Sequence, residues 1–211
     1  MIEVTNSMLD ELRAQVASSM SPKRLRHTLA VEVMIERLSN LFCPELTNAL
    51  RAAALLHDVT KELDTNAQIS LCKELGLSVT HADRVASKTL HARTAAAVIP
   101  TRYSAFDDPV IVSAVRWHTT GHSGMTLPEK LLYLADYIDD SRSFENCVIL
   151  RRYFWGGEPA RLDETARLAL LRDTLILSYD MTVRDLLADG KTVSPETIDA
   201  RNELILEALE P

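Results

Sequence analysis

The sequence predicts an all-α protein. Its 211 residues include only 6 glycines, and aromatic residues make up 5% of the chain, a balance that favours helices over many short strands. Apolar residues recur at helical spacing, and no stretch alternates apolar and polar residues with a period of two. With 46% hydrophobic and 25% charged residues, the composition is typical of a soluble globular protein, and the length suits one domain with its own core or one domain with an appended helix pair.

The first half of the chain divides into helices at recognisable start and stop residues. Serine followed by proline is a helix-start signal, aspartate or threonine caps a helix, and glycine or proline ends one. The third helix is strongly apolar, so we expect it to be central and buried. The expected ranges are 6–19, 21 to about 41, 45–58, 64–76, and 81 to about 97 with a break near Lys88.

The second half is divided in the same way. Asp108-Pro109, Pro128 and Ser194-Pro195 each start a helix, and Gly190 ends the longest one. Residues 141–160 have no clear pattern apart from a turn at two glycines and a proline. The expected helices are 108–118, 128 to beyond Asp136, 161–188 and 194 onward, with loops at 100–107 and 119–126.

The charge and the apolar runs exclude several classes of protein. The formal net charge of −7 leaves no basic footprint for a nucleic-acid polymer, although a metal and a few local cations can hold phosphate in an acidic protein. No apolar run is long enough to span a bilayer, and the N-terminus lacks the pattern of a signal peptide. The three scattered cysteines predict reduced thiols in a cytoplasmic protein: Cys43, Cys72 and Cys147.

The candidate site begins with His57-Asp58, which follows the apolar run 52–56. A carboxylate in such a run is costly to bury unless it is paired or bound to a metal. A single histidine in an apolar helix is ordinarily a hydrogen-bonded core residue, so the metal hypothesis depends on the whole set. Imidazole and carboxylate ligands on facing helices of a bundle suit iron, manganese or zinc. The other candidates are His27, His91, His118 and Asp136.

The order of these residues resembles that of the HD-domain phosphohydrolases that use two metals. Two strings, Thr119-Thr120-Gly121 and 197–202, narrow the resemblance to the YqeK-type symmetrical diadenosine tetraphosphate hydrolases. The resemblance implies an HD-domain helical bundle with C-terminal helices. It covers roughly residues 20 to 203 and is carried by residues 24–28, 57–62, 117–121, 124–125, 129–138 and 195–202.

The resemblance also implies an organisation of the chain and a set of metal ligands. We expect an N-terminal helix over 1–20, an HD metal-binding core over 21–142, and C-terminal helices over 143–211 that complete the same domain. The implied cofactors are two divalent or mixed-valent metal ions, iron foremost, with manganese, cobalt or zinc as alternatives. His27, His57, Asp58 and Asp136 would hold one metal, and His91 and His118 the other, with Asp58 bridging.

The implied reaction cleaves diadenosine tetraphosphate into two molecules of ADP. Two metals can bridge a water, lower its pKa to give a hydroxide nucleophile, and clamp the phosphoryl oxygens. Asp58 and Lys61 are the expected catalytic residues, and Lys61 would also meet phosphate, although a lysine at a helix end is also a plain dipole partner. The expected substrate-binding residues are Arg24, Lys61, Thr119, Thr120, Arg142 and Thr182.

Several features leave alternatives open. The family usually has arginine at His122, Glu-Pro at Asp139-Asp140 and asparagine at Met181, and these departures bear on substrate preference. Another HD phosphohydrolase, acting on nucleoside monophosphates or a cyclic dinucleotide, is one alternative. An HD-type oxygenase with a mixed-valent iron pair and a catalytically inactive nucleotide-binding regulator are others. The expected partners are a dinucleoside polyphosphate and ADP, and apolar helix faces could form a homodimer.

Overall fold

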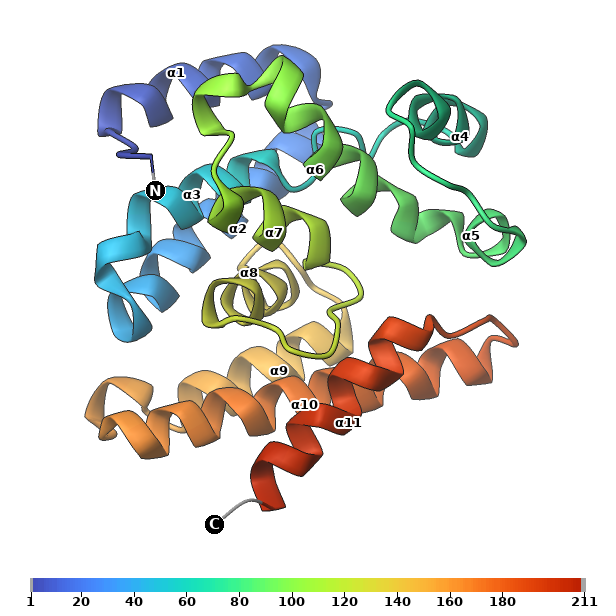
Figure 1. Cartoon of the computed structure of the whole chain (residues 1–211). Helices are drawn as coiled ribbons and strands as arrows, with labels where there is room; N and C mark the ends of the chain where they lie inside the picture. Colours follow the sequence, from blue (N-terminus) through green and yellow to red (C-terminus); the bar gives the residue numbers. More distant parts are fainter. Residues whose placement is uncertain (1, 210–211) are drawn as a thin grey trace.

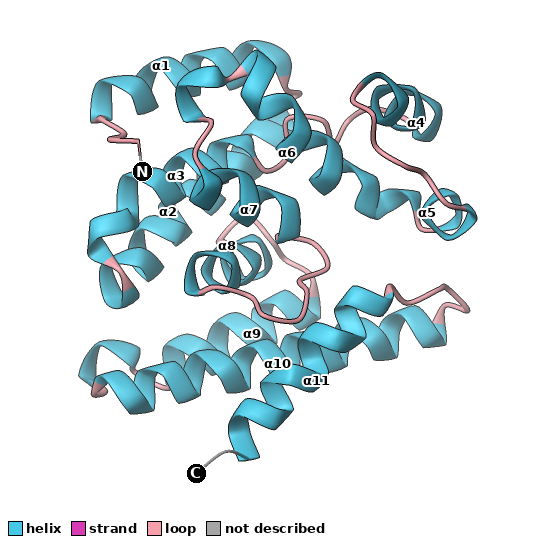
Figure 2. Ribbon diagram, viewed as in Figure 1, coloured by secondary structure: helices cyan, strands magenta, loops and turns pink. Residues whose placement is uncertain are grey.

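The computed structural model describes residues 2–209, which form helices and loops without a β-strand (Figure 2). This confirms the all-α prediction. No helix within these residues is both long and apolar enough to cross a bilayer. The α-helices are α1 (Asn6–Ser19), α2 (Pro22–Phe42), α3 (Thr47–Leu56), α4 (Thr65–Glu74), α5 (His81–Val85), α6 (Leu90–Arg102), α7 (Pro109–Trp117), α8 (Leu127–Ile138), α9 (Glu145–Gly156), α10 (Glu164–Ala188) and α11 (Pro195–Leu209).

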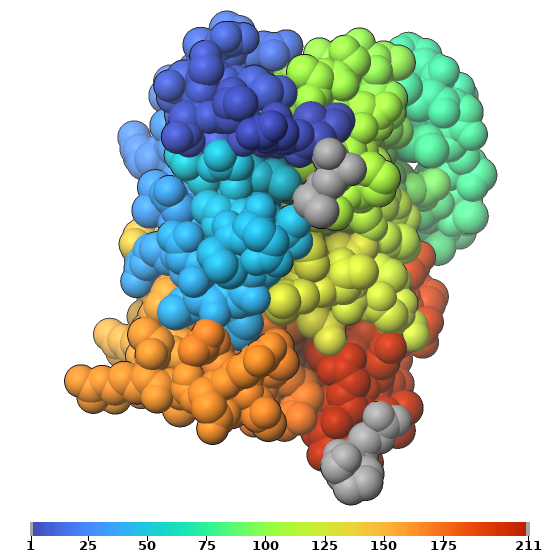
Figure 3. All heavy atoms as spheres, turned by 60° about the vertical axis from the view of Figure 1, so that its left-hand side comes forward, coloured from blue at the N-terminus to red at the C-terminus, as the bar shows by residue number. Residues whose placement is uncertain are grey.

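The helices are arranged around α3 and α8. Helix α3 packs against α1, α2 and α7, and α8 packs against α2, α7 and α9. Helices α9, α10 and α11 form a layer below α8, while α4 and α5 lie to one side of α6 (Figure 1). In the space-filling view the C-terminal helices form the lower face, directly below the surface formed by α2 and α3 (Figure 3). The candidate ligands therefore come from helices that meet at the centre of the molecule.

Helix α3 is the most deeply buried element. The side chains from Ala52 to Leu56 have no exposed surface. Three of them are alanines, whose small side chains allow α2 and α7 to approach α3 closely. The helix ends at Leu56, so His57 is its C-cap residue and Asp58 is the first residue of the turn that follows. This differs slightly from the prediction, which placed the pair inside the helix end.

The predicted helix starts are confirmed by capping hydrogen bonds. The side chain of Ser21 accepts from the backbone N–H of Arg24 at 3.3 Å, and Pro22 opens α2. Asp64 caps α4 by accepting from Ala67 N at 2.9 Å. A capping box between Thr126 and Glu129 starts α8. These bonds satisfy amide groups that a helix leaves without an internal partner.

One predicted boundary is wrong, and one helix lies where the sequence pattern allowed no clear prediction. The loop expected from Pro100 is instead the last turn of α6, which continues to Arg102. Pro100 gives up one hydrogen bond near the helix end, which costs less than in the middle of a helix. The region without a clear pattern contains α9, whose buried stripe is only three residues wide: Cys147, Leu150 and Phe154.

The loop between α7 and α8 depends on Gly121. Its φ is +63°, and a Cβ at this position would collide with the hydroxyl of Tyr179 and lie 2.9 Å from the sulfur of Met125. Tyr179 is fully buried and cannot move aside. Next to Gly121, the backbone carbonyl of Thr120 accepts a hydrogen bond from the hydroxyl of Thr197 at 3.2 Å. The loop is thereby joined to α11.

We expect Gly121→Ala to destabilise the protein more than Gly190→Ala. Gly190 has the same φ of +63° with no atom within 4 Å of an added Cβ, so its substitution costs only the left-handed backbone strain, about 1–2 kcal/mol. Gly121→Ala adds a steric clash that should cost roughly 1–3 kcal/mol more. Urea unfolding followed by circular dichroism measures the difference, and equal unfolding free energies for the two variants would contradict it.

Candidate metal centre

The structure brings the six predicted metal ligands together at the centre of the bundle. All six side chains are buried, with at most 9% of each residue exposed. Helices α3, α6, α7 and α8 present these residues at or near one end, and α2 contributes a residue from its second turn. The residues are His27 on α2, His57 and Asp58 after α3, His91 on α6, His118 after α7 and Asp136 on α8.

Asp58 lies between two pairs of histidines. Its Oδ2 atom is 3.2 Å from His57 Nε2 and 3.7 Å from His27 Nε2. Its Oδ1 atom is 3.3 Å from His91 Nε2 and 3.9 Å from His118 Nε2. One carboxylate oxygen therefore faces each pair, which is the arrangement that a bridging ligand needs.

Asp136 belongs to the first histidine pair. Its Oδ1 atom is 2.9 Å from His27 Nε2 and 3.8 Å from His57 Nε2. In the second pair, the Nε2 atoms of His91 and His118 are 3.0 Å apart. The cluster thus separates into two groups of possible ligand atoms that share Asp58.

Three of the histidines present Nε2 to the cluster because Nδ1 is held by a backbone carbonyl three residues earlier. The last carbonyls of α3 and α7 lack an intrahelical partner, so the imidazole N–H at each of these helix ends can satisfy one of them, whereas Lys88 lies in the 3-10 turn before α6. Such a bond fixes the tautomer and leaves the Nε2 lone pair for a metal. The Nδ1 partners are Ala54 O at 2.6 Å for His57, Val115 O at 2.6 Å for His118 and Lys88 O at 2.8 Å for His91.

Buried polar atoms without a hydrogen-bond partner test whether this cluster suits a metal. Among the described residues, His27 Nε2, His57 Nε2 and Asp58 Oδ1 are such atoms. Buried polar groups in folded proteins are ordinarily paired, because an unpaired group keeps its desolvation cost. These two nitrogen atoms and one oxygen atom point to the same place, and such atoms are suitable ligands for a divalent metal ion.

The protonation states of the group formed by Asp58, His91 and His118 also fit a metal. Burial, together with the nearby His57, lowers the pKa of His118 to about 4. Burial and the charge of Lys61 take the pKa of His91 well below its ordinary value. Burial alone would raise the pKa of Asp58, but His57 and His91 hold it well below the usual range. Near neutral pH this group therefore combines neutral imidazoles with a carboxylate, the forms that bind metals.

His27 differs from the other histidines. Burial lowers its pKa, but the nearby carboxylates of Asp136 and Asp139 outweigh burial and raise the pKa to about 9. A metal that binds at His27 must therefore displace a proton. Its Nδ1 atom has no helix-end carbonyl as partner and lies 3.3 Å from Asp139 Oδ2.

Three predicted phosphate-binding cations surround the cluster. Lys61 Nζ lies 3.1 Å from Nε2 and 3.2 Å from Nδ1 of His91, and burial lowers its pKa. Arg24 donates to Asp58 Oδ2, and Arg142 Nη2 donates to Asp136 Oδ1 at 2.5 Å. Each cation therefore lies next to a candidate metal ligand, within reach of an anion bound there.

A cavity of about 430 Å³ adjoins the cluster. Its wall includes the predicted Thr119, Thr120 and Thr182, together with Tyr137. Thr119 Oγ1 lies 3.2 Å from His91 Nε2, so this residue contacts both the cavity and the cluster. The hydroxyls of Tyr137 and Thr182 are 2.8 Å apart. The volume and the mixed polar and apolar lining are typical of a small-molecule site.

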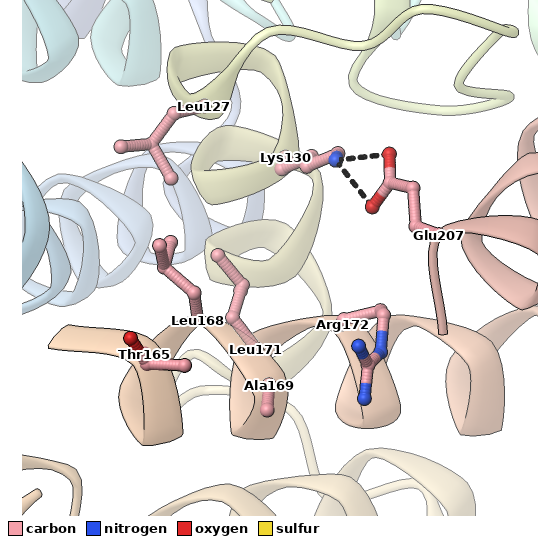
Figure 4. Close-up of a pocket in the computed structure, with 8 residues that line it drawn as sticks. All are labelled: Leu127, Lys130, Thr165, Leu168, Ala169, Leu171, Arg172 and Glu207. Atoms are coloured by element: carbon pink, nitrogen blue, oxygen red, sulfur yellow. Dashed lines mark hydrogen bonds and ion pairs between the residues drawn. The ribbon is translucent and has the colours of Figure 1, made fainter. Parts of the chain in front are cut away.

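A second cavity, of about 400 Å³, lies between α8, α10 and α11 and contains none of the candidate residues. Leucines such as Leu127 and Leu168 line one part of it, and Lys130 forms an ion pair with Glu207 at 2.9 Å (Figure 4). It lacks the paired imidazoles and carboxylates of the central cluster. We therefore assign the candidate chemistry to the central cluster alone.

The departures from the expected family pattern fall in different places. His122 Nε2 lies 3.3 Å from Glu129 Oε2, and the His122 ring packs against the Trp117 ring. His122 therefore supports the start of α8. Met181 belongs to the apolar core. Asp140 is exposed, whereas Asp139 is fully buried beside His27.

Comparison with known proteins defines the family. The model of the HD domain matches residues 24–140, more than half of the chain. The chain belongs to the HD domain family. A curated relative from Halalkalibacterium halodurans, named symmetrical bis(5'-nucleosyl)-tetraphosphatase, is 30% identical over 91% of this chain and 94% of its own. A relative of the same name from Bacillus subtilis is 28% identical over 93% of this chain and 97% of its own.

A solved HD-domain structure supports the same placement. The crystal structure of a protein from Clostridium acetobutylicum, described as a predicted HD superfamily hydrolase involved in NAD metabolism, matches this chain with a TM-score of 0.81. The two chains are 29% identical, and the match covers 94% of this chain and 97% of the other. The solved structure therefore shares the fold of most of this chain, whereas the HD-domain model itself matches residues 24–140.

Sequence reasoning missed two residues of the site, Asp139 and Tyr137. Asp139 follows Asp136 by three residues, about one helical turn, so this spacing was a possible signal for a second carboxylate on the same side. Tyr137 is adjacent to Asp136 and lines the cavity. Its hydroxyl contacts Thr182 on α10. That contact depends on where α10 packs, which no local sequence pattern reveals.

We expect the wild-type protein to bind two equivalents of divalent manganese, and Asp58→Asn to bind neither tightly. Asp58 faces both histidine pairs, so its amide would weaken both sites. His118→Ala should lose one equivalent, because His118 belongs to one group only. Equilibrium dialysis with metal analysis measures these contents. His81→Ala is the control, since His81 is an exposed histidine at the start of α5; full metal content in Asp58→Asn would contradict the assignment.

Proposed function

We propose that this protein is a metal-dependent hydrolase that cleaves diadenosine tetraphosphate symmetrically into two molecules of ADP. The observation that carries the proposal is the position of Asp58, whose two oxygens face two histidine pairs in one buried cluster. The names of the curated relatives, which align over more than 90% of this chain, support the choice of substrate.

In this proposal Asp58 is shared by two metal sites. His27, His57 and Asp136 complete one site, and His91 and His118 complete the other. The ions are divalent or mixed-valent, with iron as the first choice and manganese, cobalt or zinc as alternatives. When bound, such a pair supplies Lewis acidity toward phosphoryl oxygens and a hydroxide nucleophile near neutral pH.

The surrounding cations would bind the phosphate chain. Lys61 is the catalytic candidate, since its ammonium group lies against His91 at the centre of the cluster. A fixed cation stabilises the negative charge that develops on a phosphoryl group and on its leaving group. Arg24 and Arg142, which pair with Asp58 and Asp136, can meet the remaining phosphate oxygens through their other N–H groups.

The cavity beside Thr119 would hold one nucleoside. A base and ribose among Thr120, Tyr137 and Thr182 would direct their phosphates past Thr119 toward the cluster. With the first phosphate at the cavity mouth, the second phosphate would lie at the metals. Attack on the second phosphorus that breaks its bond to the oxygen shared with the third phosphate would leave a nucleoside diphosphate on each side, with ADP as the leaving group.

The proposal extends to the compartment and to the partners. Cys43, Cys72 and Cys147 are buried free thiols, in keeping with a cytoplasmic enzyme. The partners are the dinucleotide substrate and ADP. A homodimer formed through apolar helix faces is the proposed assembly.

Product identity tests the proposed function. The purified protein is incubated with diadenosine tetraphosphate and iron or manganese, and the nucleotides are separated by ion exchange. We expect ADP alone, and no turnover by Asp58→Asn. ATP together with AMP would contradict symmetrical cleavage. Hydrolysis of a nucleoside monophosphate or a cyclic dinucleotide in place of this substrate would favour another HD phosphohydrolase, and ADP binding without turnover would favour a regulator.

A further inference from the structure

His27 is the one candidate histidine in this cluster that is held by a side chain and not by a backbone carbonyl. It lies in the second turn of α2, where the carbonyls of the preceding turn accept helix hydrogen bonds. Its Nδ1 atom lies 3.3 Å from Asp139 Oδ2 and 3.4 Å from Ser141 Oγ. Both residues belong to the segment between α8 and α9. The acceptor that fixes this ring therefore comes from a different part of the chain.

Asp139 is itself held in place by its neighbours. It is the C-cap residue of α8, and its side chain has no exposed surface. Its Oδ1 atom accepts from Ser141 N at 2.8 Å and from the Ser141 hydroxyl. This leaves Oδ2 directed toward His27 Nδ1 and Arg142 Nε, each at 3.3 Å. The carboxylate is thus fixed on one oxygen and presents the other to the ring.

We propose that Asp139 is a positioning residue that holds His27 with Nδ1 protonated and Nε2 directed at the metal site. The inference rests on the proposed function, because it assigns a role toward the same metals. A carboxylate behind a metal-binding imidazole fixes its tautomer and orientation and increases its basicity. Asp139 makes no contact with Asp58, so its effect reaches the metals only through His27, and through Arg142 beside Asp136.

Asp139→Asn is the most informative variant. The amide oxygen would keep the two donors of Ser141, because these donors require an acceptor at the Oδ1 position. The NH₂ group would then replace Oδ2 and face His27 Nδ1. Two facing donors repel, so the ring would favour the tautomer with its proton on Nε2, which cannot bind a metal. The substitution replaces the charged oxygen that lies 3.3 Å from His27 Nδ1 by a hydrogen-bond donor and changes almost nothing in volume.

Metal affinity, measured without substrate, tests the proposal. Metal-free protein is titrated with manganese(II), and unbound manganese is counted by its electron paramagnetic resonance signal. We expect Asp139→Asn to weaken one of the two sites by about 10–100-fold. The matched control is Asp140→Asn on the same turn, whose exposed side chain contacts Arg37 and Arg151; its affinities should stay within roughly twofold of the wild type.

Two further measurements separate the loss of a positioning carboxylate from a general loss of folded structure. Thermal unfolding by circular dichroism establishes that each variant is folded. Asp139→Glu keeps a carboxylate acceptor and should bind manganese within a few-fold of the wild type. Wild-type affinity at both sites in Asp139→Asn would overturn the proposal, as would equally weak binding by folded Asp139→Glu and Asp139→Asn. A wild-type protein that binds two metals but hydrolyses nothing would contradict the proposed function and leave this inference standing.

Discussion

The burial of one carboxylate constrains the rest of the structure. Asp58 follows α3, whose side chains from Ala52 to Leu56 are fully buried, and retains 3% of its surface exposed. An ion moved out of water to such a position costs several kcal/mol unless opposite charges or metals compensate it. Arg24 supplies an opposite charge, and the Nε2 atoms of four histidines, two on each side of the carboxylate, offer ligands for metals that would supply more. Helices α2, α3, α6, α7 and α8 must therefore all meet at this point.

The helix ends explain how the bundle presents imidazoles inward. His57 and His118 stand at the C-caps of α3 and α7, and each returns an N–H to a carbonyl of its own helix. His27 lies within a helix, and its Nδ1 atom faces polar groups from elsewhere, the hydroxyl of Ser141 and the carboxylate of Asp139. The same segment carries Arg142, so the turn after α8 contributes both a positioning carboxylate and a phosphate-binding candidate. The C-terminal helices complete the site by closing the cavity beside Thr119.

Local patterns in the sequence predicted much of this arrangement. Caps at Ser21, Asp64 and Asp108 predicted helix starts because capping depends only on neighbouring residues. The assembly of the six candidate ligands was also expected, although their role as metal ligands stays a prediction. The helical turn at Pro100 and helix α9 were not foreseen, because tertiary packing determines them. Asp139 was noted only as a departure from a family pattern. Its contact with His27 joins two residues that are 112 positions apart in the sequence, so no local pattern could indicate it.

The central claim is that Asp58 bridges two metals. Anomalous X-ray diffraction from crystals of the protein loaded with manganese tests it most directly. The account predicts two anomalous peaks roughly 3.5–4 Å apart, one beside His27 and His57 and the other beside His91 and His118, with Asp58 between them. A single peak, or two peaks that do not share Asp58, would contradict it.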